Sequence, residues 1–248
     1  MIKVSTLSSW CFLVILLFAI STFFSFPAQA TIHTTAEKTG LTPEILKYAV
    51  NAYRWAIKHH QVRNASVLTV VNFNEPSFKK RLTVIDLKTG HILMHTYVAQ
   101  GRNTGAIYAK RFSNQPGSHE SSPGVFTTAN VYNGKHGESL RMNGLEEGIN
   151  NNALNRAIVI HPATYVTPTF IKQNGYAGRS WGCFAVNPAH AAELIHFLKG
   201  GSVLFAYASP EKYDARVDHA LSSAGEELYD EILGSSDNPI ERFFKSLS

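Results

Sequence analysis

Cysteine is almost absent from this chain. The 248 residues contain two cysteines, Cys11 and Cys183, and Cys11 lies within an apolar run at the N-terminus. If that run is removed on export, Cys183 remains as a single thiol with no partner for an internal disulfide. A leftover cysteine in an exported protein either pairs with a second chain or is kept for its reactivity. The scarcity of cysteine therefore draws attention to Cys183.

Sequence patterns of metal-binding, nucleic-acid-binding and membrane proteins are also missing. The chain has no H-E-x-x-H motif and no cysteine pair for zinc. His91 and His95 are spaced to share one face of a strand, but no third ligand accompanies them, so we expect no metal and no other cofactor. The net charge of +5 is scattered, without the basic runs and interleaved aromatics that indicate nucleic acid. No second hydrophobic span follows the N-terminal one.

Residues 1–30 have the features of a secretory signal. Lys3 precedes an apolar stretch from Trp10 to Phe26, and Pro27-Ala28-Gln29-Ala30 ends in the A-x-A pattern that signal peptidases accept. We expect cleavage after Ala30 and a location in the periplasm or cell envelope. An uncleaved membrane anchor is the alternative, although the apolar stretch is slightly short for a spanning helix.

The remaining sequence fits one domain with extensions. A hydrophobic content of 44% and a charged content of 17% are typical of a globular protein with a core. We divide it into an N-terminal helical segment (31–66), a main domain (67–208) and a polar C-terminal extension (209–248), helical or loose. No internal repeat is present.

Periodicity predicts a mixture of strands and helices in these segments. We expect helices at 41–62, capped by Thr42, and at 187–199, capped by Asn187, and a short helix with a loop between 165 and 179. Apolar, β-branched runs predict strands at 67–73, 125–131, 157–160 and 202–208, and a hairpin at 82–98 that turns at Thr89-Gly90. Residues 99–124 are rich in glycine, serine and asparagine and are interpreted as loops.

Two features of the main domain carry chemistry. His161 ends the apolar strand 157–160, and Cys183 ends the glycine-containing stretch Gly178-Arg179-Ser180-Trp181-Gly182-Cys183. Gly182 allows close backbone approach, and successive amides in such a turn bind an oxyanion. A histidine at a strand end can act as the base of a loop cysteine. The structural alternative is a hydrogen-bonded histidine and a small buried hydrophobic cysteine.

His161 followed by Ser180-x-Gly182-Cys183 resembles the active-site signature of the murein L,D-transpeptidase catalytic domain family. The resemblance extends over roughly 67–208 and includes the 82–98 hairpin and the turn Ser122-Pro123-Gly124. It implies a mainly β, α+β fold, similar to a β-sandwich, with a few peripheral helices and the cysteine loop at one end. It also implies an enzyme that acts on peptidoglycan stem peptides. The thiolate attacks the carbonyl that joins the L-centred third residue to D-alanine, and an amine resolves the thioester to give a cross-link.

The resemblance assigns roles to individual residues. Cys183 is the nucleophile, and His161 stabilises its thiolate and later protonates the leaving amine, so we expect a lowered pKa for the thiol. A backbone carbonyl after His161, near Pro162 and Ala163, orients the imidazole. The amides of Trp181, Gly182 and Cys183 form the oxyanion hole, and Ser180 shapes the loop.

The chain departs from the family pattern at two positions. Many members carry arginine two residues after the cysteine, where this chain has Ala185, and glycine after the histidine, where it has Pro162. Arg179 and Arg156 are the candidates to bind the substrate carboxylate instead.

Two functional alternatives remain on sequence grounds, a third is excluded, and the oligomeric state is open. An L,D-carboxypeptidase hydrolyses the same bond through the same thioester. A cell-wall-binding domain without catalysis tolerates loss of the thiol. A papain-like protease requires a Cys-Gly-Ser/Ala-Cys-Trp motif near the mature N-terminus, which the chain lacks.

Overall fold

The computed structural model describes residues 39–60 and 62–209. The expected signal segment, the predicted cleavage site and nearly all of the C-terminal extension lie outside these residues. Within the described part of the chain, no helix is long and apolar enough to cross a membrane.

The first described helix, α2 (Pro43–His59), confirms the helix predicted at 41–62. It begins where the Thr42 hydroxyl accepts a hydrogen bond from the Ile45 amide at 3.3 Å, with Pro43 in the first turn. One face of α2 is buried against β1, β2 and β8 in an apolar cluster that includes Tyr53, Leu68 and Phe205. The N-terminal helix is therefore part of the globular unit.

Eight strands form one sheet with the order β3-β2-β1-β8-β4-β5-β6-β7. Among the strand pairs of the described residues, β1–β8 and β6–β7 are parallel and the others are antiparallel. The strands are β1 (Val67–Asn72), β2 (Leu82–Asp86), β3 (Ile92–Thr96), β4 (Gly124–Gly134), β5 (Gly137–Gly144), β6 (Val159–Pro162), β7 (Phe184–Val186) and β8 (Val203–Tyr207). The predicted strands at 67–73 and 202–208 and the 82–98 hairpin are thus confirmed.

The two edges of the sheet meet and nearly close it. Just after β3, Val98 forms a bridge with Val186 of β7, and the Ala99 amide donates to the Ala185 carbonyl at 2.8 Å. A closed sheet leaves few unpaired backbone groups at its edges. The contact also places the segment after β3 beside the segment that precedes β7.

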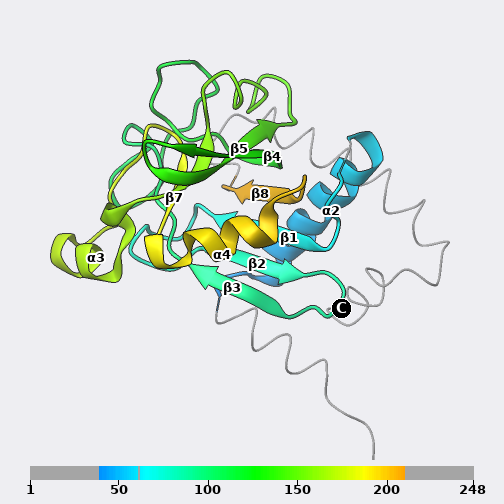
Figure 1. Cartoon of the computed structure of the whole chain (residues 1–248), viewed down its shortest axis with the longest axis horizontal. Coiled ribbons are helices and arrows are strands. Elements are labelled where there is room, and N and C mark those ends of the chain that lie inside the picture. The colour runs from blue at the N-terminus through cyan, green and yellow to red at the C-terminus, as the bar shows by residue number, and fades with distance from the viewer. Residues whose placement is uncertain (1–38, 61, 210–248) are drawn as a thin grey trace, which may run out of the picture.

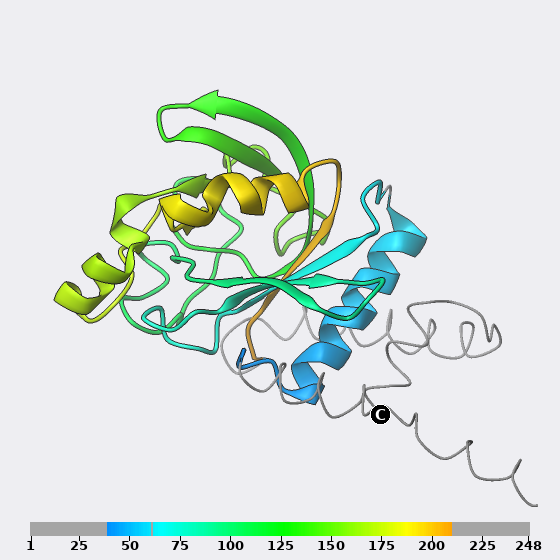
Figure 2. The ribbon, with the colours of Figure 1, turned by 60° about the horizontal axis from the view of Figure 1, so that its bottom comes forward.

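Helix α4 (Pro188–Leu198) fills the concave side of this sheet. The Asn187 side chain caps it through the Ala189 amide at 3.1 Å, as the sequence predicted. Its apolar face lies in the main core cluster together with residues of all eight strands. Figure 2 shows α4 between the β4–β5 hairpin and β2–β3, with α2 on the other side of the sheet. The opposite face of α4 is exposed at Ala192, Glu193 and His196, so α4 agrees with the peripheral helices that the sequence analysis expected.

The β4–β5 hairpin is longer than the sequence indicated. The expected strand ended at 131, but β4 continues to Gly134 and turns through Lys135 and His136 into β5. Figure 1 shows this hairpin in the upper half of the molecule, below several loops. A short 3-10 turn, η1 (Thr164–Val166), and α3 (Pro168–Asn174) follow β6 and confirm the predicted short helix. The mainly β, α+β fold is confirmed.

Candidate active site

The parallel pair β6–β7 brings the two candidate catalytic residues to one place. His161 on β6 is opposite Ala185 on β7, and Cys183 lies two residues before Ala185. Cys183 directly precedes the first paired residue of β7, so the pairing brings the cysteine loop beside the strand that carries His161. A short three-residue strand after the cysteine, which the sequence analysis did not identify, creates this arrangement.

The imidazole of His161 is buried and fixed in one tautomer. Its side chain is 3% exposed, and Nδ1 lies 2.9 Å from the carbonyl oxygen of Pro162. Because a carbonyl only accepts hydrogen bonds, Nδ1 carries a proton and Nε2 of the neutral ring is the free base. The orienting carbonyl expected near Pro162 and Ala163 is that of Pro162.

The pKa of His161 is lowered, which favours the neutral ring. Burial is the main cause, and the nearby cationic groups of His136 and Lys135 add to it, while the bond to Pro162 acts in the opposite direction. A neutral histidine is ready to accept a proton.

The pKa of Cys183 is raised, contrary to the expectation of a stabilised thiolate. Burial is the main cause, and it outweighs a hydrogen bond from the Val159 amide and the charges of Arg156 and Lys135. The half-buried sulfur lies 3.6 Å from the Ala157 carbonyl oxygen, which can accept a hydrogen bond from the thiol. Because the imidazole is neutral as well, the resting pair is a thiol and a neutral histidine.

The loop that carries Cys183 is held by the hydroxyl of Ser180. This oxygen accepts a hydrogen bond from the Gly182 amide at 3.1 Å and donates one to the Cys183 carbonyl at 2.7 Å. Gly182 has φ of +110°, and a Cβ there would lie 2.7 Å from the Glu120 carbonyl oxygen. A larger residue is therefore excluded by both backbone conformation and space. The Gly182 amide already donates to the Ser180 hydroxyl. Of the three amides expected to form the oxyanion hole, those of Trp181 and Cys183 therefore remain as donors.

A buried arginine supports this loop from the interior. The Ser180 amide donates to the Gln100 carbonyl at 2.9 Å, and the Arg102 amide donates to the Ser180 carbonyl at 2.8 Å. The side chain of Gln100 accepts from Arg81 at 2.8 Å, and Arg81 also donates twice to Val98. Burial lowers the pKa of the fully buried Arg81 to about 9. The glycine-rich loop segment after residue 98 thus holds the backbone of the cysteine loop through hydrogen bonds.

The two candidate arginines have different surroundings. Arg156 donates to the Ser113 carbonyl at 2.7 Å, to the Ser122 hydroxyl at 2.6 Å, and also to Ser118 and Glu120. Most of its donors are therefore used to hold the loop 113–122 against the site. By contrast, Arg179 is exposed and makes a single 3.4 Å hydrogen bond, to the Arg102 carbonyl.

Ala185, where the resemblance noted above implies an arginine, is completely buried. It packs in a cluster of small and apolar side chains with Ala99, Ala163 and Ala177. An arginine would not fit there without rearrangement, because protein interiors are close-packed. The departure from the family pattern therefore has a packing explanation.

Four further residues near the site were not identified from the sequence as site residues. His136 stacks on His161 with ring centroids 4.5 Å apart, and His119 stacks on Trp181 at 4.7 Å. Lys135 lies 5.8 Å from the Trp181 ring centroid, and Tyr165 interacts electrostatically with Cys183. These contacts join separate loops, so sequence spacing could not indicate them.

Backbone strain is concentrated beside the cysteine loop. Among residues 39–60 and 62–209, His119 and Ala157 are the non-glycine positions with positive φ, at 55° and 53°. His119 stacks on Trp181, and the Ala157 carbonyl accepts the Cys183 thiol. Such conformations cost about 1–3 kcal/mol each and cluster at functional sites.

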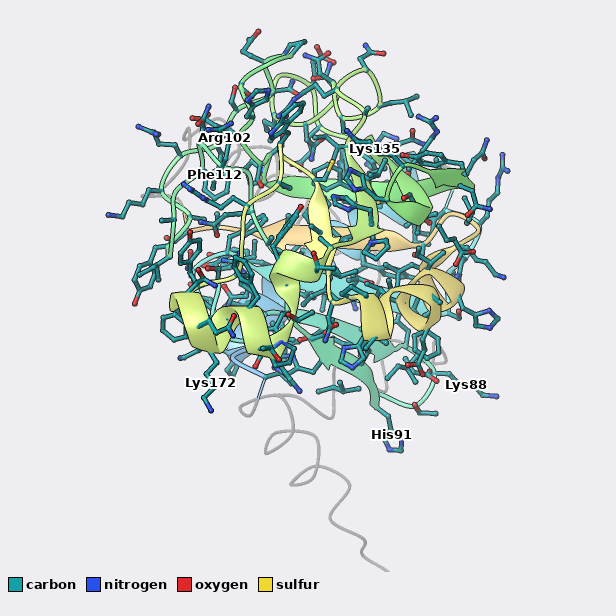
Figure 3. All side chains as sticks on the ribbon, turned by 60° about the vertical axis from the view of Figure 1, so that its left-hand side comes forward. Lys88, His91, Arg102, Phe112, Lys135 and Lys172 are labelled. Atoms are coloured by element: carbon teal, nitrogen blue, oxygen red, sulfur yellow. The ribbon has the colours of Figure 1, made fainter. Side chains whose placement is uncertain are left out.

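The histidine pair considered for a metal lies elsewhere. His95 pairs with the Thr83 hydroxyl at 3.0 Å, and His91 is exposed at the β2–β3 turn. Figure 3 shows His91 and Lys88 at the far end of the molecule from Lys135 and Arg102. No cluster of three or more metal-binding side chains occurs among the residues that the structure describes.

Comparisons with known proteins identify a family for most of the chain. The L,D-transpeptidase catalytic domain profile matches residues 37–207. No curated protein matches the sequence. The solved structures that resemble it include L,D-transpeptidases from Mycobacterium smegmatis (17% identity, 58% of this chain and 59% of that chain, TM-score 0.36), Stackebrandtia nassauensis (14%, 74% and 80%, 0.36) and Mycobacterium tuberculosis (13%, 58% and 62%, 0.32).

The assignment rests on the sequence profile, because all three TM-scores are below 0.5. The chain spans about 59% of the length of the Mycobacterium smegmatis protein. Since the profile covers well over half of the sequence, and includes both His161 and Cys183, the chain belongs to the L,D-transpeptidase catalytic domain family.

Proposed function

We propose that this protein is an exported cysteine acyltransferase that cross-links peptidoglycan stem peptides. The observation that carries the proposal is the β6–β7 pairing. It supports the proposal because Cys183 directly precedes β7, and the neighbouring strand β6 carries the buried His161, whose Nδ1 is held by a backbone carbonyl. The free Nε2 and the thiol are the two groups that acyl transfer requires.

The reaction begins with both groups neutral. As the sulfur of Cys183 attacks the carbonyl carbon of the third stem residue, Nε2 of His161 takes the thiol proton. The carbonyl oxygen becomes an oxyanion, for which the amides of Trp181 and Cys183 are the proposed donors. One such donor is typically worth about 3–4 kcal/mol of transition-state stabilisation. In this mechanism the thiol loses its proton during the attack. The sequence analysis had instead suggested a thiolate that is already present in the free enzyme.

The remaining steps return the site to its starting state. The protonated His161 gives its proton to the leaving nitrogen, the C–N bond breaks, and D-alanine departs. The acyl group remains on Cys183 as a thioester. An amine of a second stem then attacks the thioester, His161 accepts its proton, and the sulfur leaves and is reprotonated. The products are a new amide bond and the free thiol.

Arg179 is the proposed partner of a substrate carboxylate. Its guanidinium is exposed near the cysteine loop and makes one weak hydrogen bond, so donors remain for a ligand. Arginine matches carboxylate geometry with two parallel hydrogen bonds. For Arg156 we propose positioning: it holds the 113–122 loop, and its charge favours the ionised form of Cys183.

D-alanine release with and without an acceptor tests the proposed reaction. The mature protein is incubated with a stem tetrapeptide, and free D-alanine and peptide products are measured. A transpeptidase yields a joined product when an acceptor amine is added, whereas an L,D-carboxypeptidase yields free tripeptide alone. A wall-binding domain releases no D-alanine under either condition.

Export is tested separately. We propose that the chain is cleaved after Ala30 and acts in the periplasm or cell envelope, because of the signal-like residues 1–30. N-terminal sequencing of the exported protein should find Thr31. A chain that starts at Met1 and stays in the membrane would contradict this part of the proposal.

A further inference from the structure

The turn of the β4–β5 hairpin contacts the candidate active site at three points. His136 stacks on His161 with centroids 4.5 Å apart and planes 27° apart. Lys135 lies 5.8 Å from the centroid of the Trp181 ring. A Cβ placed on Gly137 would lie 3.9 Å from the ring of Pro162, so the backbone also approaches β6. The turn therefore spans from the histidine strand to the cysteine loop.

The geometry of the hairpin fixes the turn in this place. Gly134 pairs with Gly137, which leaves Lys135 and His136 as a two-residue loop. Gly137, directly after this loop, has φ of +85°, a left-handed conformation that glycine adopts without steric cost. On its other side, β5 pairs with β6 through Leu140 and Ile160. Because the strand that carries His161 is bonded to the strand that leaves the turn, the position of His136 over His161 is set by the sheet.

His136 and His161 differ in exposure, which determines what each can do. His161 is 3% exposed, whereas His136 is exposed. The outer imidazole therefore covers one face of the inner one. Two imidazolium rings at this separation repel each other, so protonation of either ring opposes protonation of the other.

We propose that His136 is a positioning residue for the acyl-transfer reaction: it holds the plane of the His161 ring and keeps that ring neutral, so that Nε2 can accept the proton of Cys183. The inference rests on the proposed function for its catalytic consequence, but the pairing of the two rings can be measured without turnover. The lowered pKa of His161 agrees with this role, since His136 and Lys135 both contribute to it.

Several charged or titratable groups surround the two rings and enter any account of their pH dependence. Lys135 and His136 come from the hairpin turn, and Cys183 from the cysteine loop. Arg156, before β6, and Tyr165, after it, act on Cys183. Of these groups, His136 is the one whose ring stacks on that of His161.

The direct test is an NMR titration of the His161 imidazole in the full mature chain. The His161 signal is assigned by its loss in His161→Gln. In His136→Ala, removal of the covering ring both exposes His161 and removes the repelling charge, so its pKa should rise toward the ordinary value. His136→Gln carries the same prediction without opening as large a gap. In His136→Phe the ring face stays covered, so the pKa should remain closer to that of the wild type.

Kinetics supply a second readout. His136→Ala should lower kcat by about tenfold through loss of ring orientation, with KM nearly unchanged, and should move the acidic limb of the pH–rate profile to higher pH. His136→Phe should recover much of kcat. The matched control is His91→Ala, which removes an exposed histidine from the distant β2–β3 turn and should change neither quantity.

Two results would overturn the proposal. An unchanged His161 pKa in both His136→Ala and His136→Gln would show that the rings are not coupled. The second result combines two measurements: the acidic limb of the pH–rate profile is unchanged, and His136→Ala and His136→Phe lose the same thermal stability. This result would show that the turn has only a structural role. Failure of the proposed reaction itself would appear differently, as absent D-alanine release in the wild type while the NMR coupling persists.

Discussion

The hydroxyl of Ser180 lies 2.7 Å from the carbonyl oxygen of Cys183 and donates a hydrogen bond to it. The same oxygen accepts the Gly182 amide at 3.1 Å, so one side chain closes the turn that presents the thiol. Ser180 itself is 4% exposed, and its backbone is fixed by Gln100 and Arg102. Its role is thus in the shape of the loop, and direct contact with substrate is not required.

Replacement of Ser180 by alanine should loosen the loop. Ser180→Ala removes both hydrogen bonds and leaves a buried amide unpaired, which should lower the free energy of unfolding by about 1–3 kcal/mol. We expect kcat for D-alanine release to fall by about tenfold or more, because the thiol is no longer held in place. Chemical denaturation and steady-state kinetics measure the two effects. Ser66→Ala, which removes an exposed hydroxyl, should leave both unchanged.

The reactivity of Cys183 should reflect a neutral resting thiol. Because burial raises its pKa, alkylation of the free enzyme should have its midpoint above the ordinary cysteine value. Lys135→Gln removes a charge that favours the thiolate, so the midpoint should rise further. Lys88→Gln, at the opposite end of the molecule in Figure 3, should not alter it. An alkylation midpoint between pH 6 and 7 would contradict this prediction. It would support the thiolate–imidazolium pair that the sequence analysis suggested.

Loss of Arg179 should weaken substrate binding more than the chemical step. Arg179→Gln is expected to raise KM for the stem tetrapeptide by about fivefold and to change kcat little, because an exposed charge-assisted bond contributes about 1 kcal/mol. Lys172→Gln removes a positive charge from α3 and serves as the control. Equal KM values for the two variants would move the carboxylate site away from Arg179.

Glu146 should make the stability of the protein depend on pH. This carboxyl is 4% exposed beside the Val125 amide, and burial raises its pKa from 4.5 to about 7. Between these values the folded protein binds a proton that the unfolded chain releases, so stability is full below pH 4.5 and falls as the pH rises to about 7. The loss should be about 3 kcal/mol.

Unfolding measured at several pH values checks this linkage. Glu146→Gln should remove this component of the pH dependence. Above pH 7 the variant should therefore gain stability relative to the wild type. Glu147→Gln alters an exposed carboxylate and should retain the wild-type slope. The same slope in Glu146→Gln and the wild type would assign the titration to another group.

Helix ends and tight turns depend mainly on residues that are close in the sequence, and these features could be predicted. The caps at Thr42 and Asn187 marked two helices, and the Thr89-Gly90 turn marked one hairpin. The fold class came from resemblance to a family, carried by His161 and the cysteine loop. Strand β5 was missed because Glu138 and Arg141 interrupt its apolar pattern, and its pairing with β4 and β6 decides its conformation.

Long-range contacts account for what the sequence could not provide in the site. The stacking of His136 on His161 depends on the register of three strands. The pKa of Cys183 is raised because the thiol is buried, and the spacing of residues in the sequence does not reveal burial. Likewise, the commitment of the Gly182 amide to Ser180 depends on the φ of one glycine.

The central claim is that Cys183 carries the acyl group. Intact-mass analysis of the mature protein after incubation with a stem tetrapeptide, followed by peptide mapping, tests it most directly. The account predicts a mass increase equal to the tripeptide acyl group, located on the Cys183 peptide. It also predicts no adduct and no D-alanine release in a folded Cys183→Ala variant. Wild-type D-alanine release by Cys183→Ala would contradict the account.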